Sequence, residues 1–423
     1  MSACGAEYGL ISIDQALSLI QQRAQAGCVE IIDLNSALHR YLAESVYSNI
    51  NLPMFSQSAV DGYAIHADDV IQADSTFALI GEIRAGQSAE FELKHGQAVR
   101  IFTGAQIPNG TTTIARQEIV KAVNSKFVDS ERIDPKSEET KSITLTDNLK
   151  AHADIRDIGE EISVGQCLAE KGQQLTAGAI AALSMAGIQQ VLVFQYPKVA
   201  VVITGDEVAE MVEDFASGKI FDANAPLIQA WFKQRNHTVE IFHVADTELA
   251  VKTLLDDLSQ NYQLILTTGG VSVGDYDFIR PVALDLGFEQ IFWKVKQKPG
   301  KPMFFAELQK TDQTSCYLLG LPGNPAAVYV GMQIYTSTLL DALQGQASSL
   351  QWFSAELSHD LKADARERFL RMSVQFDQAK LKVQSLAKQQ SHMLSNLMQA
   401  NCLVRIPAGE QIEAGQIVQG IFI

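Results

Sequence analysis

Three predicted strands alternate with two predicted helices in the middle of this chain, and this alternation constrains the fold more than any other feature. The strands are apolar runs at Val199–Ile203, Val239–Val244 and Leu264–Leu266. The helices are two segments, residues 224–235 and 247–258, whose apolar residues recur at helical spacing. Continuous apolar strands connected through helices are typical of a parallel sheet that is covered on both faces. The sequence therefore predicts an α/β layer, and ligands of such layers bind at the carboxyl ends of the strands.

Both flanking parts of the chain are predicted to be β-rich. Short apolar runs and many glycines lie between Val46 and Arg116, and residues 352–423 return to strand-like alternation with glycine turns. Residues 121–150 are polar and predict a surface hairpin or loop, whereas Ile13–Ala26 has the spacing of an amphipathic helix. The length of 423 residues fits two to four domains at roughly 100–200 residues each.

The composition disfavours several classes of protein. A net charge of −16 argues against a mainly electrostatic nucleic-acid binder, which needs a cationic surface. The five cysteines are odd in number and have no CxxC spacing, which disfavours disulfide scaffolds and thiolate zinc sites. No apolar run reaches the ~18 residues of a membrane span, and Met1–Leu10 lacks the regions of a signal peptide. We therefore expect a cytoplasmic protein that binds neither nucleic acid nor membranes.

A glycine-rich segment, Thr267–Asp277, follows the last of the three strands and precedes a predicted helix. Glycines let the backbone approach a phosphate closely, and the amino-terminal end of a helix favours negative charge. The segment lacks the lysine of a Walker A loop, which disfavours an ordinary P-loop nucleotidase. On these residues alone, phosphate binding and a purely structural strand-to-helix turn are equally good interpretations.

Two proline-containing segments are further candidates. Trp293–Pro302 carries four lysines within eight residues, and its prolines stiffen a basic loop that suits phosphate or molybdate. A solvated charge run is the usual interpretation of such a segment, but the acidic background favours a function here. Gly320–Pro325 has a predicted N-cap, Asn324, and a proline at the first helical position, which explains it structurally. The N–H groups of Gly323 and Asn324 could still seat an anion.

Scattered carboxylates form the last group of candidates. They are Asp61, the Glu160–Glu161 pair, Glu207, Asp246, Asp275 and Asp277. Oxygen ligands from several loops suit Mg²⁺ with a phosphate substrate, although most single carboxylates only make a surface soluble. Asp206 and Glu207 end a buried strand, which strengthens their candidacy. No metal-ligand spacing links His66, His95, His152 and His392, which are interpreted as structural.

Seven motifs, some of which contain the candidate residues above, occur in one order along the chain. They are Val60–Ala64, Thr103–Gly110, Arg156–Ile162, Thr204–Glu207, Gly269–Asp277, Lys298–Pro302 and Leu321–Pro325. As a set they resemble the molybdopterin molybdenumtransferases, whose animal relative is the carboxyl-terminal part of gephyrin. The resemblance covers nearly the whole chain and includes Gln390–Ser395 near its end.

The resemblance implies an elongated homodimer whose subunits combine α/β and β domains. The implied domains are a helical linking domain I (residues 1–50 and 148–178), a β-rich domain II (51–147), a three-layer, molybdopterin-binding α/β domain III (179–344) and a small, barrel-like β domain IV (345–423). The implied active site lies between domain III and a β domain of the partner subunit.

The implied reaction takes adenylylated molybdopterin and molybdate, releases AMP and leaves molybdenum on the dithiolene sulfurs, with Mg²⁺ as the cofactor. The implied catalytic residues are Asp61, Glu207, Asp246, Asp277, Lys294 and Lys298. The implied substrate-binding residues are Thr103, Gly269, Gly270, Ser272, Lys301, Pro322, Pro325, Arg371 and Ser391. The implied metal ligands are Glu161, Glu207 and Asp246. A molybdopterin adenylyltransferase and recipient molybdoenzymes are implied as further partners.

This chain departs from the family pattern at three positions. Glu161 stands where the family usually has Asp, Thr111 stands where an Asp is common, and Arg280 replaces a frequent Lys. An extra methylene at Glu161 shifts the carboxylate by about one bond length, and a guanidinium differs from an ammonium in geometry. These departures concern the arrangement of the metal more than the overall reaction.

Three alternatives remain beside the molybdenum insertase. A gephyrin-like scaffold would cluster partner proteins, but we expect no extra amino-terminal domain here, and the basic and acidic site elements are kept. A molybdopterin adenylyltransferase needs only the α/β domain, whereas this chain carries three further domains. A phosphate-binding α/β protein without a link to molybdenum does not explain the ordered set of motifs.

Overall fold

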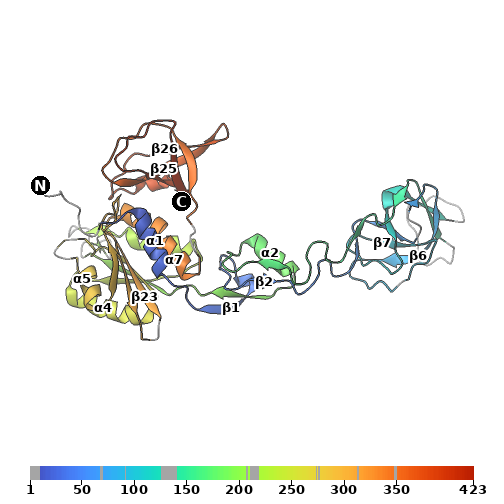
Figure 1. Ribbon diagram of the computed structural model, residues 1–423, viewed down its shortest axis with the longest axis horizontal. Coiled ribbons are helices and arrows are strands. Elements are labelled where there is room, and N and C mark those ends of the chain that lie inside the picture. The colour runs from blue at the N-terminus through green and yellow to red at the C-terminus, as the bar shows by residue number, and fades with distance from the viewer. Residues whose placement is uncertain are drawn as a thin grey trace.

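The computed structural model describes residues 10–66, 70–90, 92–124, 141–205, 208–209, 219–272, 274, 277–311, 314–346 and 350–423. The molecule is elongated: an α/β layer and a small barrel lie at one end, a narrow connection in the middle and a second β-rich body at the other end (Figure 1). The predicted elongated, multidomain α/β-plus-β architecture is confirmed.

A six-stranded sheet forms the centre of the α/β layer. Its strand order is β18-β15-β19-β23-β22-β20. The strands are β15 (Val199–Thr204), β18 (Glu240–Val244), β19 (Leu264–Thr268), β20 (Glu289–Trp293), β22 (Phe304–Gln309) and β23 (Ser315–Leu321). The first four strands in this order are parallel, as predicted, but β22 runs antiparallel to both of its neighbours. The short connection from β22 to β23 explains this difference, because only antiparallel neighbours can be joined without a crossover.

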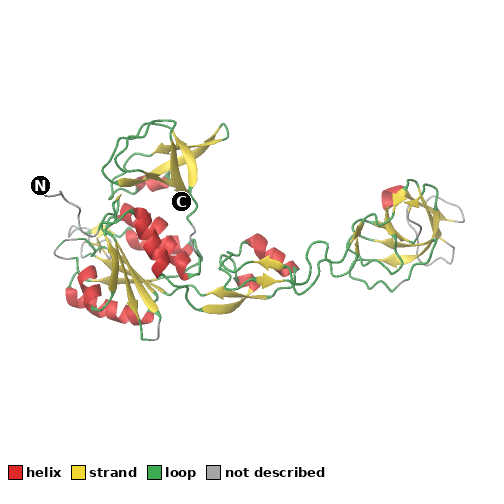
Figure 2. Ribbon diagram, in the orientation of Figure 1, coloured by secondary structure: helices red, strands yellow, loops and turns green. Residues whose placement is uncertain are grey.

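Helices cover both faces of this sheet, which gives the predicted three layers (Figure 2). The helices are α3 (Asn224–Lys233), α4 (Glu248–Asn261), α5 (Ile279–Asp285), α6 (Pro325–Gly331) and α7 (Ser337–Leu343). A π-helical turn, Met332–Thr336, joins α6 to α7. One apolar core lies beneath α3, α6 and α7, and a second core lies beneath α4 and α5. Both faces of the sheet are therefore buried, which explains why its strands are continuously apolar.

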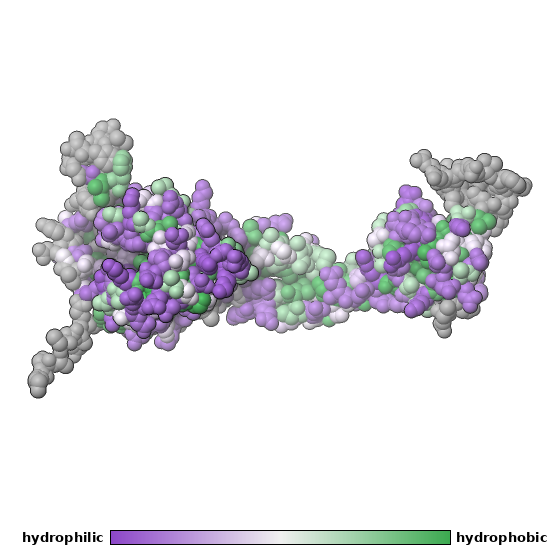
Figure 3. All heavy atoms as spheres, turned by 90° about the horizontal axis from the view of Figure 1, so that it is seen from above, coloured by the Kyte–Doolittle hydropathy of each residue, from purple (hydrophilic) through white to green (hydrophobic). Residues whose placement is uncertain are grey.

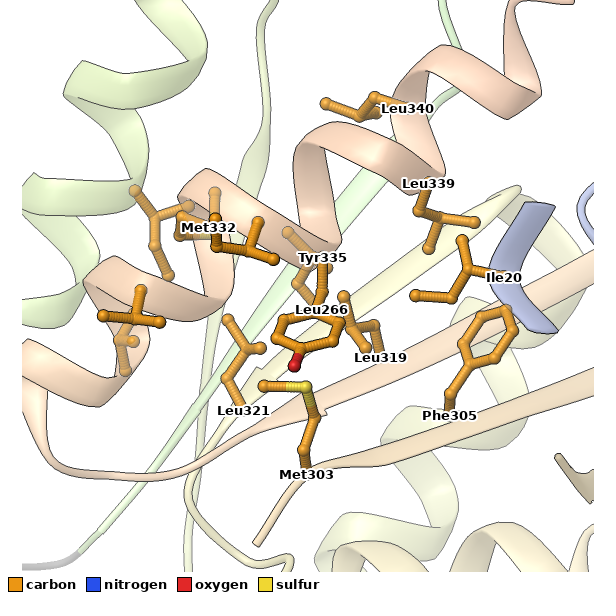
Figure 4. Packing of buried hydrophobic residues seen from close by; sticks show 14 of the residues in the cluster. Ile20, Leu266, Met303, Phe305, Leu319, Leu321, Met332, Tyr335, Leu339 and Leu340 are labelled. Carbon is orange, nitrogen blue, oxygen red and sulfur yellow. The ribbon is translucent and has the colours of Figure 1, made fainter. Parts of the chain in front are cut away.

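Helix α1 (Ile13–Arg23) packs on the same α/β layer. Ser12 and Gln15 form a capping box at its start, which stabilises the first turn. Ile13, Ala16 and Ile20 of its apolar stripe are buried in the first core, where Ile20 lies beside Leu339 and Phe305 (Figure 4), and Leu17 is partly buried. The position of helix α1 in the α/β layer differs from the expectation that residues 1–50 belong to a linking domain. The stripe that made the helix recognisable is buried against α7 and the sheet rather than within the connection.

The connection begins after α1. Strand β1 (Val29–Asp33) pairs antiparallel with β14 (Gln190–Phe194), and the two form a ribbon that leaves the α/β layer. Helix α2 (Ala177–Met185) and the short helix η1 (Leu34–Ser36) share a small core with this ribbon. Along the connection, β2 (Val46–Tyr47) pairs with β13 (Cys167–Ala169), and β3 (Gln57–Ser58) pairs with β12 (Ile155–Arg156). Two further short pairs lie elsewhere. Strand β5 (Val70–Ile71) pairs with β11 (Leu149–Lys150) in the distant β-rich body, and β16 (Val208–Ala209) pairs with β17 (Ile220–Phe221) between β15 and α3.

The distant β-rich body contains a second six-stranded sheet, of order β8-β4-β7-β6-β10-β9. Its strands are β4 (Gly62–Ile65), β6 (Thr76–Ile83), β7 (Gln97–Ile101), β8 (Thr113–Arg116), β9 (Val120–Asn124) and β10 (Lys141–Leu145), with the short helix η2 (Gln117–Ile119) before β9. Strands β9 and β10 pair antiparallel, which confirms a hairpin within residues 121–150. The tip of that hairpin lies outside the described residues.

The carboxyl-terminal part is a closed five-stranded barrel, which confirms the small, barrel-like β domain that the family resemblance implied. Its strands are β24 (Phe353–Leu357), β25 (Glu367–Asp377), β26 (Lys380–Ser385), β27 (Cys402–Ile406) and β28 (Ile417–Phe422), and η5 (Ser395–Met398) is a short helix between β26 and β27. Strand β25 pairs with both β26 and β27, so the sheet closes on itself. A short strand of the α/β layer, β21 (Gln297–Lys298), adds in parallel to β25 and joins the two domains. Within the described ranges, none of the helices has the length and apolarity that crossing a membrane requires.

An aspartate is buried inside helix α7, and its titration should be visible in the stability of the protein. Burial raises the pKa of Asp341 to about 7, from an ordinary value of 3.8. Between these pH values the folded state binds more protons than the unfolded state, so stability should fall as the pH rises. Relative to Asp341→Asn, the wild type should lose up to about 1.4 kcal/mol per pH unit from about pH 4 to about pH 7, and nothing further above that.

Chemical denaturation of both proteins across this pH range measures the difference. An equal substitution at the exposed Asp256 of helix α4 is the control for the change of side chain. Parallel stability curves for the wild type and Asp341→Asn would contradict this assignment.

Candidate functional site

A pocket of about 330 Å³ lies at the carboxyl ends of the parallel strands. Because these strands run in the same direction, the segments that follow them meet at one edge of the sheet. Gly205 follows β15, Asp246 follows β18, the Gly269–Gly270 pair follows β19, and Pro325 follows β23; all of them line the pocket. The motifs that the sequence placed after separate strands therefore converge.

Close backbone approach accounts for the paired glycines. Gly269 and Gly270 have φ values of +91° and +69°, which favour glycine. A Cβ at Gly269 would lie 2.5 Å from Thr204 Oγ1, and a Cβ at Gly270 would lie 2.5 Å from Ile279 Cγ1. The N–H of Ile279, at the start of helix α5, donates to Gly270 O at 3.1 Å. The glycines thus fold the chain tightly between strand β19 and helix α5 and leave bare backbone on the pocket wall.

Three carboxylates line this pocket, and two of them also order its loops. Asp277 Oδ2 accepts a hydrogen bond from Gly274 N at 2.7 Å. Asp222 Oδ1 accepts from Asn224 N at 2.7 Å and from Ala225 N at 3.1 Å, which holds the start of helix α3. Asp246 is the third carboxylate. The pocket therefore combines negative side chains with exposed backbone, and a phosphate there needs positive charge nearby.

Trp293 connects the lysine-rich segment to the glycine-rich turn. Its indole Nε1 donates to Val271 O at 2.9 Å, so the end of β20 is fixed beside residue 271. The Arg280 guanidinium lies 4.0 Å from the centre of the indole ring, and Lys294 Nζ lies 4.1 Å from it. Cation–π contacts of this length hold a positive charge in place. The indole of Trp293 thus holds the positive charges of Arg280 and Lys294 next to the glycine-rich turn.

A buried glutamine shapes the turn that carries the other two lysines. Gln297 is fully buried; its Oε1 accepts from Tyr335 Oη at 2.5 Å, and its Nε2 donates to Gly300 O at 3.2 Å. Lys298 is exposed and its Nζ contacts Asp364 Oδ2 of the barrel at 2.8 Å. Lys301 is half-buried on the same turn. The lysines are therefore presented where the α/β layer meets the barrel.

The two predicted barrel residues lie where the barrel touches helix α6. Ser391 O accepts from Ala326 N, at the start of α6, at 3.0 Å. Arg371 is buried, and its guanidinium donates to the carbonyl oxygens of Met393, Lys388 and Gln390 at 2.5, 3.1 and 3.2 Å. In this structure Arg371 thus holds the loop that carries Ser391. Pro322 is buried just before α6, and Ser272 is exposed on the glycine-rich turn, outside the pocket lining.

The remaining predicted residues lie elsewhere. Asp61 and Thr103 belong to the distant β-rich body, where Asp61 Oδ1 accepts from both N and Oγ1 of Thr103 at 2.8 Å. These two hydrogen bonds lower the pKa of Asp61. Glu161 is exposed in the segment that returns from that body. Glu207 and Asp275 lie outside the described residues, as does Asp206.

The pocket fits Mg²⁺ only in combination with a substrate. Within the ranges that the structure describes, no three His, Cys, Asp or Glu side chains are grouped so that they could hold a metal ion. Mg²⁺ is commonly held by one or two carboxylates together with substrate phosphates and water. The pocket carboxylates Asp246 and Asp277 suit that arrangement, whereas Glu161 does not lie beside them within one subunit.

Some residues of this site were missed by the sequence analysis. Asp222 and Asn224 line the pocket, and Asn224 Nδ2 donates to Gly323 O at 2.9 Å. An Asp shortly before a predicted helix is a helix-start signal that could have marked Asp222. No sequence pattern indicates that Trp293 bonds Val271 or that Gln297 bonds Tyr335, because each pair is joined only in the folded chain.

Comparisons with known proteins cover nearly the whole chain. Residues 11–187 match the MoeA N-terminal region (domain I and II), residues 200–342 match a probable molybdopterin-binding domain, and residues 354–423 match the MoeA C-terminal region (domain IV). A molybdopterin molybdenumtransferase of Haemophilus influenzae is 32% identical, over 97% of this chain and 98% of its own. One of Bacillus subtilis is 29% identical, over 98% and 94%. A solved molybdopterin biosynthesis moeA protein of Pyrococcus horikoshii shares the fold, with a TM-score of 0.78 at 24% identity over 98% of this chain and 100% of its own.

Proposed function

The chain belongs to the molybdopterin molybdenumtransferase family, and from this premise we propose that it inserts molybdenum from molybdate into adenylylated molybdopterin. The reaction releases AMP and leaves molybdenum on the two dithiolene sulfurs. The observation that carries this proposal is the single pocket formed by Gly269, Gly270, Asp246 and Asp277 at the carboxyl ends of the parallel strands. A phosphate-bearing ligand fits bare glycine backbone at the start of a helix.

The backbone and the lysines around the pocket bind the two anionic substrates at different places. The backbone at Gly269 and Gly270 receives the pterin phosphate, and Lys294 neutralises it from its position on Trp293. Lys298 and Lys301 attract molybdate at the contact between the α/β layer and the barrel, where the loop of Ser391 meets helix α6. Catalysis then rests on positioning and on electrostatic stabilisation of the phosphate and the oxyanion.

Mg²⁺ is the cofactor that we propose for this reaction. Asp246 would hold it, with Glu207 and the partner's Glu161 as further ligands. When bound, the cation offsets the negative charge that the phosphates bring into a pocket already lined by carboxylates. The lysines alone would otherwise have to balance the carboxylates, two phosphates and molybdate.

We propose that the working form is a homodimer, because residues Asp61 and Thr103 lie at the end of the subunit opposite to the pocket (Figure 1). A second copy could bring these residues to the pocket.

The middle of the molecule carries exposed apolar surface, which commonly marks a protein interface (Figure 3). Its apolar side chains that are more than half exposed are Ile31, Tyr47, Met54, Ile158, Val164 and Met185. We further propose that the protein is cytoplasmic. An adenylyltransferase would deliver its substrate, and molybdoenzymes would receive its product.

Turnover of the defined substrate tests the proposed function. The purified protein is incubated with adenylylated molybdopterin, molybdate and Mg²⁺, and AMP is measured over time. We expect AMP release that depends on molybdate. In a parallel incubation with molybdopterin, ATP and Mg²⁺, synthesis of adenylylated molybdopterin would instead identify an adenylyltransferase, if the first mixture shows no molybdate-dependent AMP release.

Substituting Lys298 should separate molybdate binding from stability. Because the Lys298 side chain is half exposed at its ion pair with Asp364, Lys298→Ala should change the free energy of unfolding by about 1 kcal/mol or less. The KM for molybdate should rise about tenfold at low salt, since one charged contact to the oxyanion is lost, and the difference should shrink as salt screens the charge. Steady-state kinetics at two salt concentrations measure this effect. The exposed Lys380→Ala, which removes another Lys–carboxylate pair of the barrel, is the control. Equal KM values for Lys298→Ala and wild type would remove Lys298 from the site.

A further inference from the structure

A second polar pocket, also of about 330 Å³, lies where three parts of the chain meet. Tyr41 and Tyr196 come from the connection, Arg235 from the end of helix α3, and Ser337, Asp341 and Gln344 from helix α7 and its end. Phe422 of the barrel strand β28 also lines it. This pocket, called the junction pocket below, shares no lining residue with the pocket of Gly269 and Asp277.

A buried acceptor in the junction pocket has no donor among the described residues. Gln344 is 5% exposed; its Nε2 donates to Leu340 O at 3.2 Å, but its Oε1 is buried and accepts no hydrogen bond from the described residues. A buried carbonyl oxygen without a donor costs free energy, so such groups are normally satisfied. A pocket-bound molecule with an N–H or O–H group would satisfy Gln344.

A half-buried arginine, Arg235, lines the same pocket. Among the described residues, Arg235 donates a single hydrogen bond, from Nη1 to Trp231 O at 3.3 Å, and forms no ion pair. Its guanidinium carbon lies 3.6 Å from the centre of the Trp231 ring, which fixes its position. Burial leaves the positive charge poorly solvated and lowers the pKa of Arg235, while the negative charge of Asp341 in the same pocket acts in the opposite direction. The guanidinium has five N–H donors, and an oxyanion is the group that such a fork binds best.

The helix that forms one wall of this pocket is also irregular. The π-helical turn Met332–Thr336 separates α6 from α7, and Gln333 of this turn and Ser337 directly after it line the pocket. Such single π-helical turns occur frequently at functional sites. The π-helical turn is therefore part of the pocket wall.

We propose that the junction pocket binds a small metabolite that carries both an oxyanion and an N–H donor. Arg235 holds the oxyanion, and Gln344 Oε1 accepts from the donor. Asp341, whose titration lies near neutral pH, is a second partner for that donor. The proposal does not depend on the molybdenum reaction, because none of these residues lines the pocket of Asp277.

Two probes with the same two-carbon spacer next to the ammonium group distinguish the sources of the oxyanion. β-Alanine carries a carboxylate and an ammonium group, and O-phosphoethanolamine carries a phosphate and an ammonium group. Calorimetric titration of the full-length protein with each probe, and with acetate as the anion without a donor, measures affinity. We expect one zwitterion to bind, and acetate to bind about tenfold or more weakly, because it leaves Gln344 unsatisfied.

Two substitutions test the pocket itself. Arg235→Gln should weaken binding of that probe about tenfold or more, since a charged hydrogen bond is lost. Ser337→Leu should abolish binding by filling the cavity, while AMP release in the molybdenum assay stays unchanged and reports an intact fold. The exposed Arg84→Gln in the β-rich body is the matched control and should bind like the wild type. The proposal is overturned if neither zwitterion binds at millimolar concentration, or if binding is the same in Arg235→Gln and Ser337→Leu as in the wild type.

Discussion

Asp277→Asn should reduce the rate of AMP release by about 100-fold or more, because preorganised groups at the reacting phosphate commonly contribute that much. Asp277 lines the pocket and its carboxylate fixes the glycine-rich turn through the N–H of Gly274. The asparagine keeps an oxygen that can accept this hydrogen bond, so the turn should remain folded. What is lost is the negative charge of Asp277 in the pocket. Single-turnover kinetics with adenylylated molybdopterin measure the rate of AMP release directly.

The exposed Asp256→Asn on helix α4 is the control, since it removes an equal charge from the same domain away from the pocket. It should keep the wild-type rate. Thermal unfolding of Asp277→Asn should match that of the wild type, which separates a catalytic loss from misfolding. Wild-type turnover by Asp277→Asn would exclude this aspartate from the chemistry.

The sequence predicted the α/β layer well, because burial on both faces of a parallel sheet leaves a strong local pattern. Val199–Ile203 and Leu264–Leu266 are strands of that sheet, and the polar residues after parallel strands must meet at one edge. Asp246, Gly269 and Asp277 therefore could be placed in one pocket from their positions alone.

The features that the sequence did not predict depend on contacts between distant segments. Helix α1 was recognisable from its spacing, but an amphipathic stripe does not say which surface covers it, and here helix α7 does. Strand β22 is antiparallel because a short connection joins it to β23. The sequence shows how short this connection is, but not that the two strands are neighbours in the sheet. Arg371 was expected to seat molybdate, whereas its guanidinium is occupied by three carbonyl oxygens of the Ser391 loop. Its part in molybdate binding stays a prediction, and positioning of Ser391 is the role that these contacts favour.

Asp61 and Asp277 lie at opposite ends of the subunit, so we predict that activity depends on how substitutions of these two residues are distributed between the subunits of a dimer. If each active site takes Asp61 from one subunit and Asp277 from the other, both single variants should be inactive as homodimers. A heterodimer with Asp61→Asn in one subunit and Asp277→Asn in its partner then has one site with both substitutions and one intact site. Two different affinity tags allow this heterodimer to be purified, and it should retain about half of the wild-type rate of AMP release.

The reciprocal heterodimer makes the outcome decisive. When both substitutions are placed in one subunit and the partner is wild type, each shared site contains one substituted aspartate, and AMP release should be lost. Sites built within single subunits would give the opposite pair of results: an inactive first heterodimer and a half-active second one. Because the two heterodimers carry the same substitutions in equal numbers, differences in stability cannot produce this reversal. Only the distribution of Asp61 and Asp277 between the subunits differs, so the comparison isolates the geometry of the site.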